Sequence, residues 1–322
     1  MGLPAGWSRL AERTRSRKTA ASAEGPQRRV TRPVRGSAAS RHDPEGRASC
    51  DERLEPLGSR HFRGGARPDI IDDMTDGSTT VTIPGDAPTA AELRIAVHGG
   101  DVALVRHLLS DDPDLATARF TARGGSGTAL HFVTDWPGYF PNGPDIVHLL
   151  VDAGADPNAT TTGPGKPETP LHYAASSDDV DVAAALIDRG ADLETPDGSI
   201  GTPLDNAIDY ACWHVARLLA MRGARIEKVW HAAALGVLET LEGLLVPGMD
   251  REEISKGFWH ACGAGQRRAA ERLLTAGADL DWVPDYAEGT ALDAADGLGT
   301  RQENVIEWLR SIGARSSKAE KE

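Results

Sequence analysis

The chain has 322 residues, 40% of them hydrophobic and 26% charged, and a formal net charge of −13 at pH 7. No stretch approaches the roughly 18 apolar residues that a membrane-spanning helix needs, so we expect neither a membrane span nor a secretory signal peptide. The three cysteines, Cys50, Cys212 and Cys262, are scattered and lack CxxC spacing, which argues against a disulfide framework or a zinc ribbon and favours a cytoplasmic protein.

Residues 1–73 differ in composition from the rest of the chain. They carry fifteen Lys and Arg against ten Asp and Glu, a net charge of +5, which leaves −18 for residues 74–322. They show no apolar periodicity and cannot offset an ordering cost of about 1–2 kcal/mol per residue, so we predict a disordered Arg-rich tail. Basic runs such as Arg13–Lys18 leave open a tether to nucleic acid or an anionic surface. A true start at Met74 also stays open, because an ordinary polar segment begins there.

A repeat begins after this tail and a polar lead-in, residues 74–90. Four hexapeptides share a pattern of Thr, a small residue or Pro, Leu, and then His or Asp: TALHFV from Thr128, TPLHYA from Thr169, TPLDNA from Thr202 and TALDAA from Thr290. The middle two are 33 residues apart. A second interval, sixteen residues from an alanine to a glycine, joins Ala174 to Gly190, Ala207 to Gly223, Ala232 to Gly248 and Ala261 to Gly277. Equal intervals of this kind indicate a repeat architecture.

Each interval contains apolar residues at helical spacing, so it predicts a second helix that the glycine ends in a left-handed conformation. Thr169 and Thr202 stand where an N-cap oxygen accepts from the first turn, and each is followed by a proline that lacks an amide donor. Thr89, three residues before Glu92, has capping-box spacing and is predicted to open the first unit. Each unit should therefore be a helix, a short turn, a second helix and an extended link.

The period and the T-P-L-H-x-A pattern resemble the ankyrin repeat family. The resemblance implies an all-α fold, an α-solenoid of about seven helix-turn-helix units over residues 91–316, followed by a charged tail, residues 317–322. The first helices should open near Leu93, Leu130, Leu171, Leu204, Val229, Phe258 and Leu292. Links in the family form hairpin fingers, which should be short or irregular here. An insertion at Asp135–Asp145 and a short link between Gly223 and Val229 are the reasons for this expectation.

His172 is the first residue that suggests chemistry. It shares its repeat position with His131 and Asp205. Side chains at one position of neighbouring repeats lie roughly 8–10 Å apart, whereas a nucleophile and its base need about 3 Å. In the family this histidine ties a repeat to its neighbour, so we expect a structural role. The alternative that stays open is an enzyme without a recognisable signature, with a site near His131, His172 and Asp205.

No P-loop, GxSxG or HExxH motif occurs, so the chain is predicted not to be an enzyme and to hold no cofactor. His260 and Cys262, with His231 and Cys212 in preceding units, suggest a metal cluster at first sight. Residues two apart point about 200° apart around a helix, which prevents convergence on one ion. We therefore predict no metal site.

The leading hypothesis is an interaction scaffold that binds another protein on the concave face and fingers of the array. The candidate contact residues are Tyr173, Asn206, His231 and His260 on the first helices, Trp282 and Tyr286 in a finger, and Trp136, Tyr139 and Phe140 in the insertion. The charge of −18 favours a partner with a basic surface and disfavours nucleic-acid binding by the repeats. The sequence makes no prediction of oligomeric state.

Overall fold

The computed structural model describes residues 80–122, 124–297 and 302–318. The predicted tail, residues 1–73, lies outside the described residues, as do residues 74–79 and 319–322. Within the described part the helices form seven consecutive pairs, numbered here as units 1 to 7. The pairs are α2 (Pro88–Gly99) and α3 (Val102–Asp111), α4 (Ala129–Val133) and α5 (Gly143–Asp152), α6 (Pro170–Ser177) and α7 (Val180–Asp188), α8 (Pro203–Asp209) and α9 (Trp213–Met221), α10 (Val229–Leu235) and α11 (Leu238–Leu244), α12 (Arg251–Gly263) and α13 (Arg267–Thr275), and α14 (Ala291–Gly297) and α15 (Glu303–Ser311).

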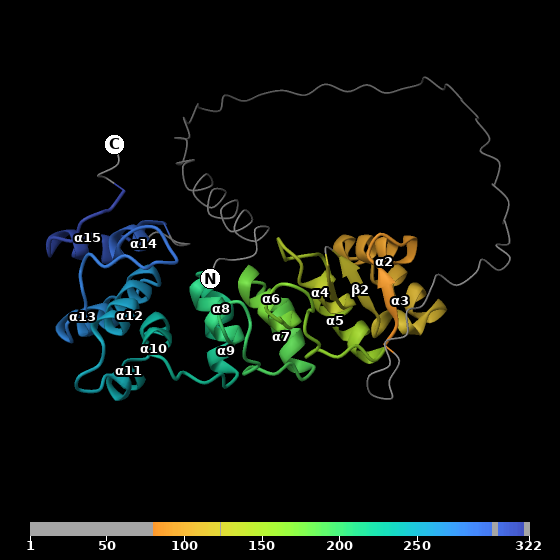
Figure 1. The fold of residues 1–322 in the computed structure, drawn as a ribbon, viewed down its shortest axis with the longest axis horizontal. Helices are drawn as coiled ribbons and strands as arrows, with labels where there is room; N and C mark the ends of the chain where they lie inside the picture. The colour runs from red at the N-terminus through yellow and green to blue at the C-terminus, as the bar shows by residue number, and fades with distance from the viewer. Residues whose placement is uncertain (1–79, 123, 298–301, 319–322) are drawn as a thin grey trace, which may run out of the picture.

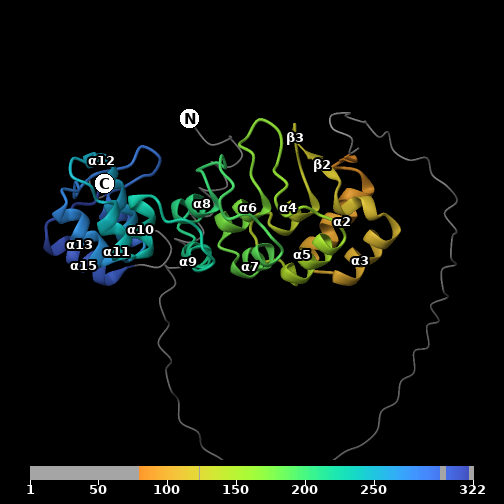
Figure 2. The same ribbon diagram turned by 90° about the horizontal axis from the view of Figure 1, so that it is seen from below.

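The units follow one another along the long axis of the molecule, from α2 at one end to α15 at the other (Figure 1). Figure 2 shows the two helix layers in units 2–4, with α4, α6 and α8 in one layer and α5, α7 and α9 in the other. Loops project from the side of the first helices. The predicted helical solenoid is confirmed, with a short 3₁₀ turn, η1 (Pro113–Ala116), after α3.

Most second helices end where the sequence spacing predicts. Positive φ values mark a glycine two residues after the second helix in five units, namely Gly154, Gly190, Gly223, Gly277 and Gly313. In unit 5 the predicted end is wrong, because α11 ends at Leu244, well before Gly248. The predicted caps Thr169 and Thr202 accept from the backbone amides of His172 and Asp205. Local backbone requirements therefore set the length of each unit.

Two predicted helix starts are wrong. The first helix begins at Pro88 after Ala87, which makes no side-chain cap, so Thr89 lies within the first turn. Proline at the first helical position sets the start instead, because its missing amide leaves no donor unsatisfied. Helix α12 begins at Arg251, well before Phe258, because the Asp250 carboxylate accepts from the amide of Glu252.

A small sheet was not predicted. It has three strands in the order β1 (Thr82–Pro84), β2 (Arg119–Ala122) and β3 (Gly125–Gly127). Strands β1 and β2 are parallel, and β2 and β3 form an antiparallel hairpin. Ser126 continues the pairing to Thr162 of the next link. The sheet therefore joins the loops of units 1 and 2 on one side of the helices.

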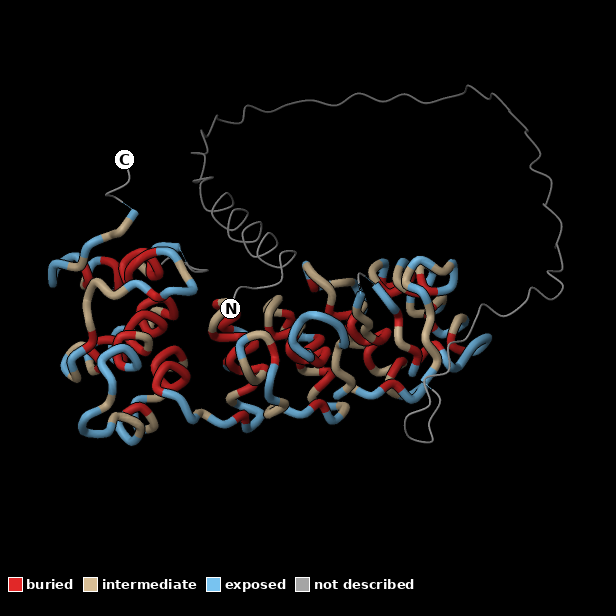
Figure 3. Tube along the Cα trace, in the orientation of Figure 1, coloured by how far each residue is buried: buried red, intermediate tan, exposed pale blue. Residues whose placement is uncertain are grey.

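The buried apolar residues form two clusters that divide at the link between units 4 and 5 (Figure 3). The first extends through units 1–4, and the second extends from Val229 to Leu309. Trp230, Ala234 and Ala264 of the later units belong to the first cluster, and Ile226 of the short link packs against both. The irregularity expected at this link is thus a break in the core, bridged by few side chains.

Ion pairs join the second helices of some neighbouring units. Asp152 pairs with Arg189, Asp188 with Arg222 and Glu242 with Arg272, so α5 joins α7, α7 joins α9, and α11 joins α13. Among the described residues no ion pair joins α9 to α11, and none joins α3 to α5. Exposed pairs contribute little stability each, up to about 1 kcal/mol. The division of the core, rather than the missing ion pair, therefore marks the link between units 4 and 5.

We expect Ala211→Gly to stabilise the protein. Ala211 connects α8 to α9 with φ 57°, a conformation that glycine adopts without steric cost. The free energy of unfolding should rise by about 1 kcal/mol, as measured by urea unfolding of the full chain. The matched control is Gly236→Ala in unit 5, where φ is 71° and a Cβ would lie 2.3 Å from Gln266 Oε1. The control should lose stability; a loss in both variants would contradict the assignment.

Candidate protein-binding surface

The repeated Thr and His or Asp residues form closed caps at the starts of the first helices. In unit 3 the Thr169 amide donates to His172 Nδ1 at 3.2 Å, and the His172 amide donates to Thr169 Oγ1 at 3.4 Å. Thr202 and Asp205 exchange the same two bonds in unit 4. Each cap satisfies two amides that a helix start leaves without partners. The Thr residue and the His or Asp residue act as one structural element.

The second ring nitrogen of the histidine, Nε2, connects each unit to the next. His131 Nε2 donates to the Glu168 carbonyl and His172 Nε2 to the Gly201 carbonyl, both at 3.0 Å. A carbonyl only accepts, so Nε2 carries the proton in both rings and Nδ1 is the acceptor. In unit 6, Trp259 Nε1 makes the equivalent bond to a carbonyl of the following link, at 3.1 Å. The tie therefore persists where the histidine has been replaced.

These contacts use both nitrogens of both histidines. Burial lowers the pKa of His131 to about 4 and also lowers the pKa of His172. Both imidazoles are neutral near pH 7, and neither has a nitrogen left to accept a proton from a substrate in this conformation. Their geometry is that of a structural connection.

Asp205 makes a different connection, across the link between units 4 and 5. Its Oδ1 accepts from Lys228 Nζ at 2.5 Å and from His231 Nε2 at 2.8 Å. Burial would raise the pKa of Asp205, but the hydrogen bonds from His231, Lys228 and the Thr202 amide hold it well below its ordinary value. A charged, buried carboxylate thus joins two units where the apolar core divides.

Three of the predicted contact residues are buried and serve internal packing. Asn206 donates to Glu168 Oε1 at 2.8 Å, inside a network that also takes a hydrogen bond from the Ser199 hydroxyl. His231 binds Asp205, and His260 stacks at 5.1 Å on the ring of Trp230. Asn206, His231 and His260 therefore offer no surface to a partner in this conformation. The error arises because side chains of the neighbouring units cover this slot, which no local pattern reports.

The six remaining candidates keep accessible surface, and five of them form two separate groups. The insertion patch consists of Trp136, Tyr139 and Phe140, between α4 and α5; Tyr139 is 62% exposed. The Tyr139 backbone amide donates to Asp179 Oδ2 at 2.6 Å, which fixes the loop on unit 3. The finger patch is Trp282 and Tyr286, between α13 and α14. Trp282 packs against the second core, whereas Tyr286 is 42% exposed.

Tyr173 lies apart from both patches, on α6. It is half-buried and meets the His131 ring edge-on, with centroids 5.3 Å apart. The structure therefore does not bring Tyr173 into one patch with the predicted finger residues Trp282 and Tyr286.

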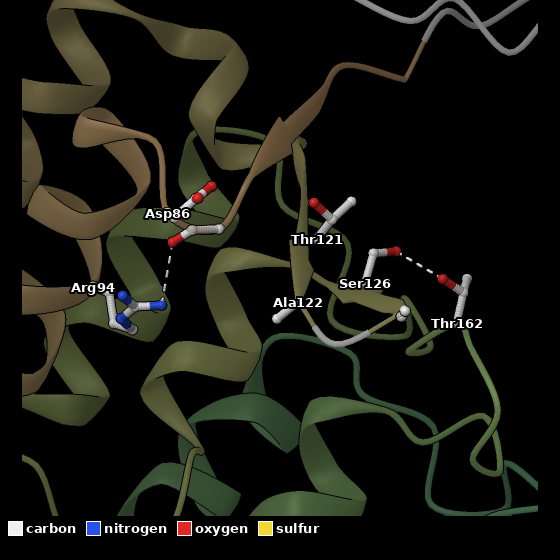
Figure 4. A pocket seen from close by; sticks show the side chains of 9 residues that line it. Asp86, Arg94, Thr121, Ala122, Ser126 and Thr162 are labelled. Carbon is white, nitrogen blue, oxygen red and sulfur yellow. Dashed lines mark hydrogen bonds between the residues drawn. The ribbon is translucent and has the colours of Figure 1, made fainter.

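A shallow cleft that the sequence did not indicate lies between units 1 and 2 (Figure 4). It has a volume of about 660 Å³ and is lined by Gly85, Asp86, Arg94, Thr121, Ala122, Gly124, Gly125, Ser126 and Thr162. The Ser126 and Thr162 hydroxyls are hydrogen-bonded to each other at 2.8 Å, and Arg94 reaches the Gly85 carbonyl at 3.5 Å. Its described lining is mostly backbone and hydroxyl groups that are already paired.

The described part of the chain contains no group of three or more His, Cys, Asp or Glu side chains placed to hold a metal ion. Cys212 and Cys262 are buried and lie in no disulfide, and burial raises the pKa of Cys262. None of the described helices has the length and apolar character that crossing a membrane requires.

Comparison with known proteins agrees with this geometry. The family model described as "Ankyrin repeats (3 copies)" matches residues 138–229. The chain contains ankyrin repeats. A Fowlpox virus (strain NVSL) protein named as an ankyrin repeat protein is 32% identical over 136 residues, which are 42% of this chain and 28% of that relative. The chain therefore spans little more than a quarter of the relative's length.

A solved structure, the ankyrin repeat domain of Bcl-3, described as a unique member of the IkappaB protein family, is 25% identical to this chain. The match has a TM-score of 0.39 and covers 71% of this chain and all of that domain. Ankyrin repeats are protein–protein interaction modules. In units 2–4 here, His131, His172 and Asp205 connect one unit to another.

The buried histidines of these ankyrin repeats should make stability depend on pH. Unfolded His131 takes up a proton near pH 6.5, whereas the folded residue does so near pH 4, so stability falls as pH is lowered through this window. Asp205 contributes only at lower pH, because its folded pKa lies below its ordinary 3.8. Urea unfolding at about pH 7, 5.5 and 4.5 measures the effect. His131→Gln should show a shallower loss; an unchanged slope would contradict the prediction.

Asp205→Asn should destabilise the link between units 4 and 5. The variant removes the charge that the Lys228 ammonium and His231 approach, and leaves their buried hydrogen bonds poorly matched. We expect a loss of about 3 kcal/mol in the free energy of unfolding. Asp181→Asn, at an exposed position in the first turn of α7, is the control for loss of one negative charge. Equal, small effects in both variants would show that the Asp205 cluster contributes little.

Proposed function

We propose that this chain is a non-enzymatic adaptor that binds another protein through its first helices and the loops beside them. The observation that carries the proposal is the position of Tyr286. Its ring is 42% exposed on the loop before α14, and its hydroxyl lies 3.3 Å from His260 Nε2 of α12. An aromatic ring held in place before binding supplies contact area at low entropic cost, which is typical of interface anchors.

Charge supports a basic partner. Residues 74–322 carry a net charge of −18, which attracts cationic surfaces and repels phosphate backbones. We therefore propose a protein with a basic face as the partner, and no direct nucleic-acid role for the repeats. The cytoplasm remains the proposed compartment, since the two described cysteines lie in no disulfide.

Affinity capture from native lysate with the full chain tests the proposal. A double variant, Tyr173→Ala with Tyr286→Ala, should lose at least one captured protein, because it removes the accessible rings beside the first helices. The control is Met221→Ala with Val246→Ala, two exposed apolar positions near the second helices; Met221 is 77% exposed. Capture should fall as salt rises. Identical captured sets for both double variants and the unchanged chain would contradict an adaptor surface on this side.

A further inference from the structure

Three consecutive units build a site that already holds a cation. The Lys256 ammonium of α12 lies 4.7 Å from the centroid of the Trp230 ring of α10 and 5.4 Å from that of Tyr286, on the loop before α14. Both distances are within the roughly 6 Å at which a cation is attracted to an aromatic face. Among the described residues Lys256 makes no salt bridge or hydrogen bond. Its charge is therefore met by aromatic faces rather than by a carboxylate.

The rim of this site is acidic. Asp285 adjoins Tyr286 in the chain, and Glu253 lies three residues before Lys256 on α12, a spacing that places both side chains on one face of the helix. Burial and the charges of Asp209, Asp285, Glu253 and Glu252 raise the pKa of the Tyr286 hydroxyl. Within the described residues, Asp285, Glu252 and Glu253 take part in no salt bridge. The other lysine near the site, Lys228, is bound to Asp205. Negative charge thus exceeds positive charge around the two rings, and a further cation is attracted there.

The site can open without unfolding. Lys256 is half-buried at the surface, and its flexible stem allows the ammonium to leave the rings for water. Trp230 is only 4% exposed, with Lys256, Lys228 and His260 all against its ring, whereas Tyr286 is 42% exposed, so departure of the ammonium frees a face of the Tyr286 ring. A guanidinium suits that face better than an ammonium, because it is planar, less strongly hydrated and stacks on rings.

We infer that the Tyr286 ring, beside Trp230, binds an arginine side chain of a basic partner segment, which displaces the Lys256 ammonium while Asp285 and Glu253 lie at the rim. This cation site rests on the proposed adaptor function and specifies its partner by chemistry. Lys256 acts as an internal occupant that keeps the site closed in the absence of the partner.

A fluorescent nine-residue peptide of alternating Arg and Ser, titrated into the full chain, tests the cation site by anisotropy. Lys256→Ala should tighten binding about fivefold, since it removes both a competitor and a like charge. Arg310→Ala, which removes one positive charge from the exposed side of α15, should change binding less than twofold. Equal effects of these two variants would overturn the inference.

The ring itself is tested by two substitutions. Tyr286→Ala should weaken binding about fivefold, and Tyr286→Phe, which keeps the ring, should bind like the unchanged chain. A peptide with Lys in place of Arg should bind more weakly than the Arg peptide. Thermal melts confirm that each variant is folded. Equal losses for Tyr286→Ala and Tyr286→Phe, or no binding of the Arg peptide, would overturn the cation site.

The two proposals fail in different ways. If Lys256→Ala and Tyr286→Ala capture the same lysate proteins as the unchanged chain, while Tyr173→Ala loses one, the cation site is wrong and the adaptor function stands. If the Arg peptide binds as expected but no lysate protein depends on the loops beside the first helices, the adaptor function is wrong.

Discussion

The structure depends on a hydrogen bond from a buried ring nitrogen of one unit to a backbone carbonyl of the next link. Apolar burial holds neighbouring units together, but it is non-directional and sets no register. The bonds from His131, His172 and Trp259 supply that direction, and each is buried, where leaving a donor unpaired costs about 1–3 kcal/mol. In unit 3 the link lies so close to the ring that a Cβ on Gly198 would be 2.5 Å from His172 Cδ2. The histidine therefore fixes the link as well as the helix.

Where this bond is absent, the array changes. Asp205 occupies the same position in unit 4 and, as an acceptor, cannot donate to a carbonyl, so the following unit supplies Lys228 and His231 as donors. The core divides at this link, and the series of ion pairs between second helices is interrupted there. The repeated position thus changes from a donor, His172, to an acceptor, Asp205, at the link where a polar connection takes the place of a continuous apolar core. Each unit contacts only its neighbours, so the irregularity stays local.

Equal spacing predicted the seven helix pairs, because glycine and N-cap requirements are local and recur with the repeat. The sheet could not be predicted in this way, since Thr82–Pro84 pairs with Arg119–Thr121 of a distant segment and its strands are too short to show alternation. The start of α12 was not predicted correctly, because the interval used was the one from Ala261 to Gly277, and both residues lie after Arg251, where the helix begins. Asn206 and His260 were assigned to a partner surface because their slot on the first helix often faces the concave side in ankyrin repeats, but packing of the neighbouring units decides its exposure.

The proposed binding residues lie where the repeat departs from its pattern. In units 2–4 the repeated position holds His131, His172 and Asp205, whose polar atoms are used in contacts within and between units. In unit 5 the same position holds Trp230, which makes no tie of this kind and instead presents ring faces to Lys228 and Lys256. A ring thus replaces a hydrogen-bonding connector in the unit that follows the break in the core. Local departures from a consistent pattern are expected at functional positions, and units 5–7 fit that expectation better than the regular units do.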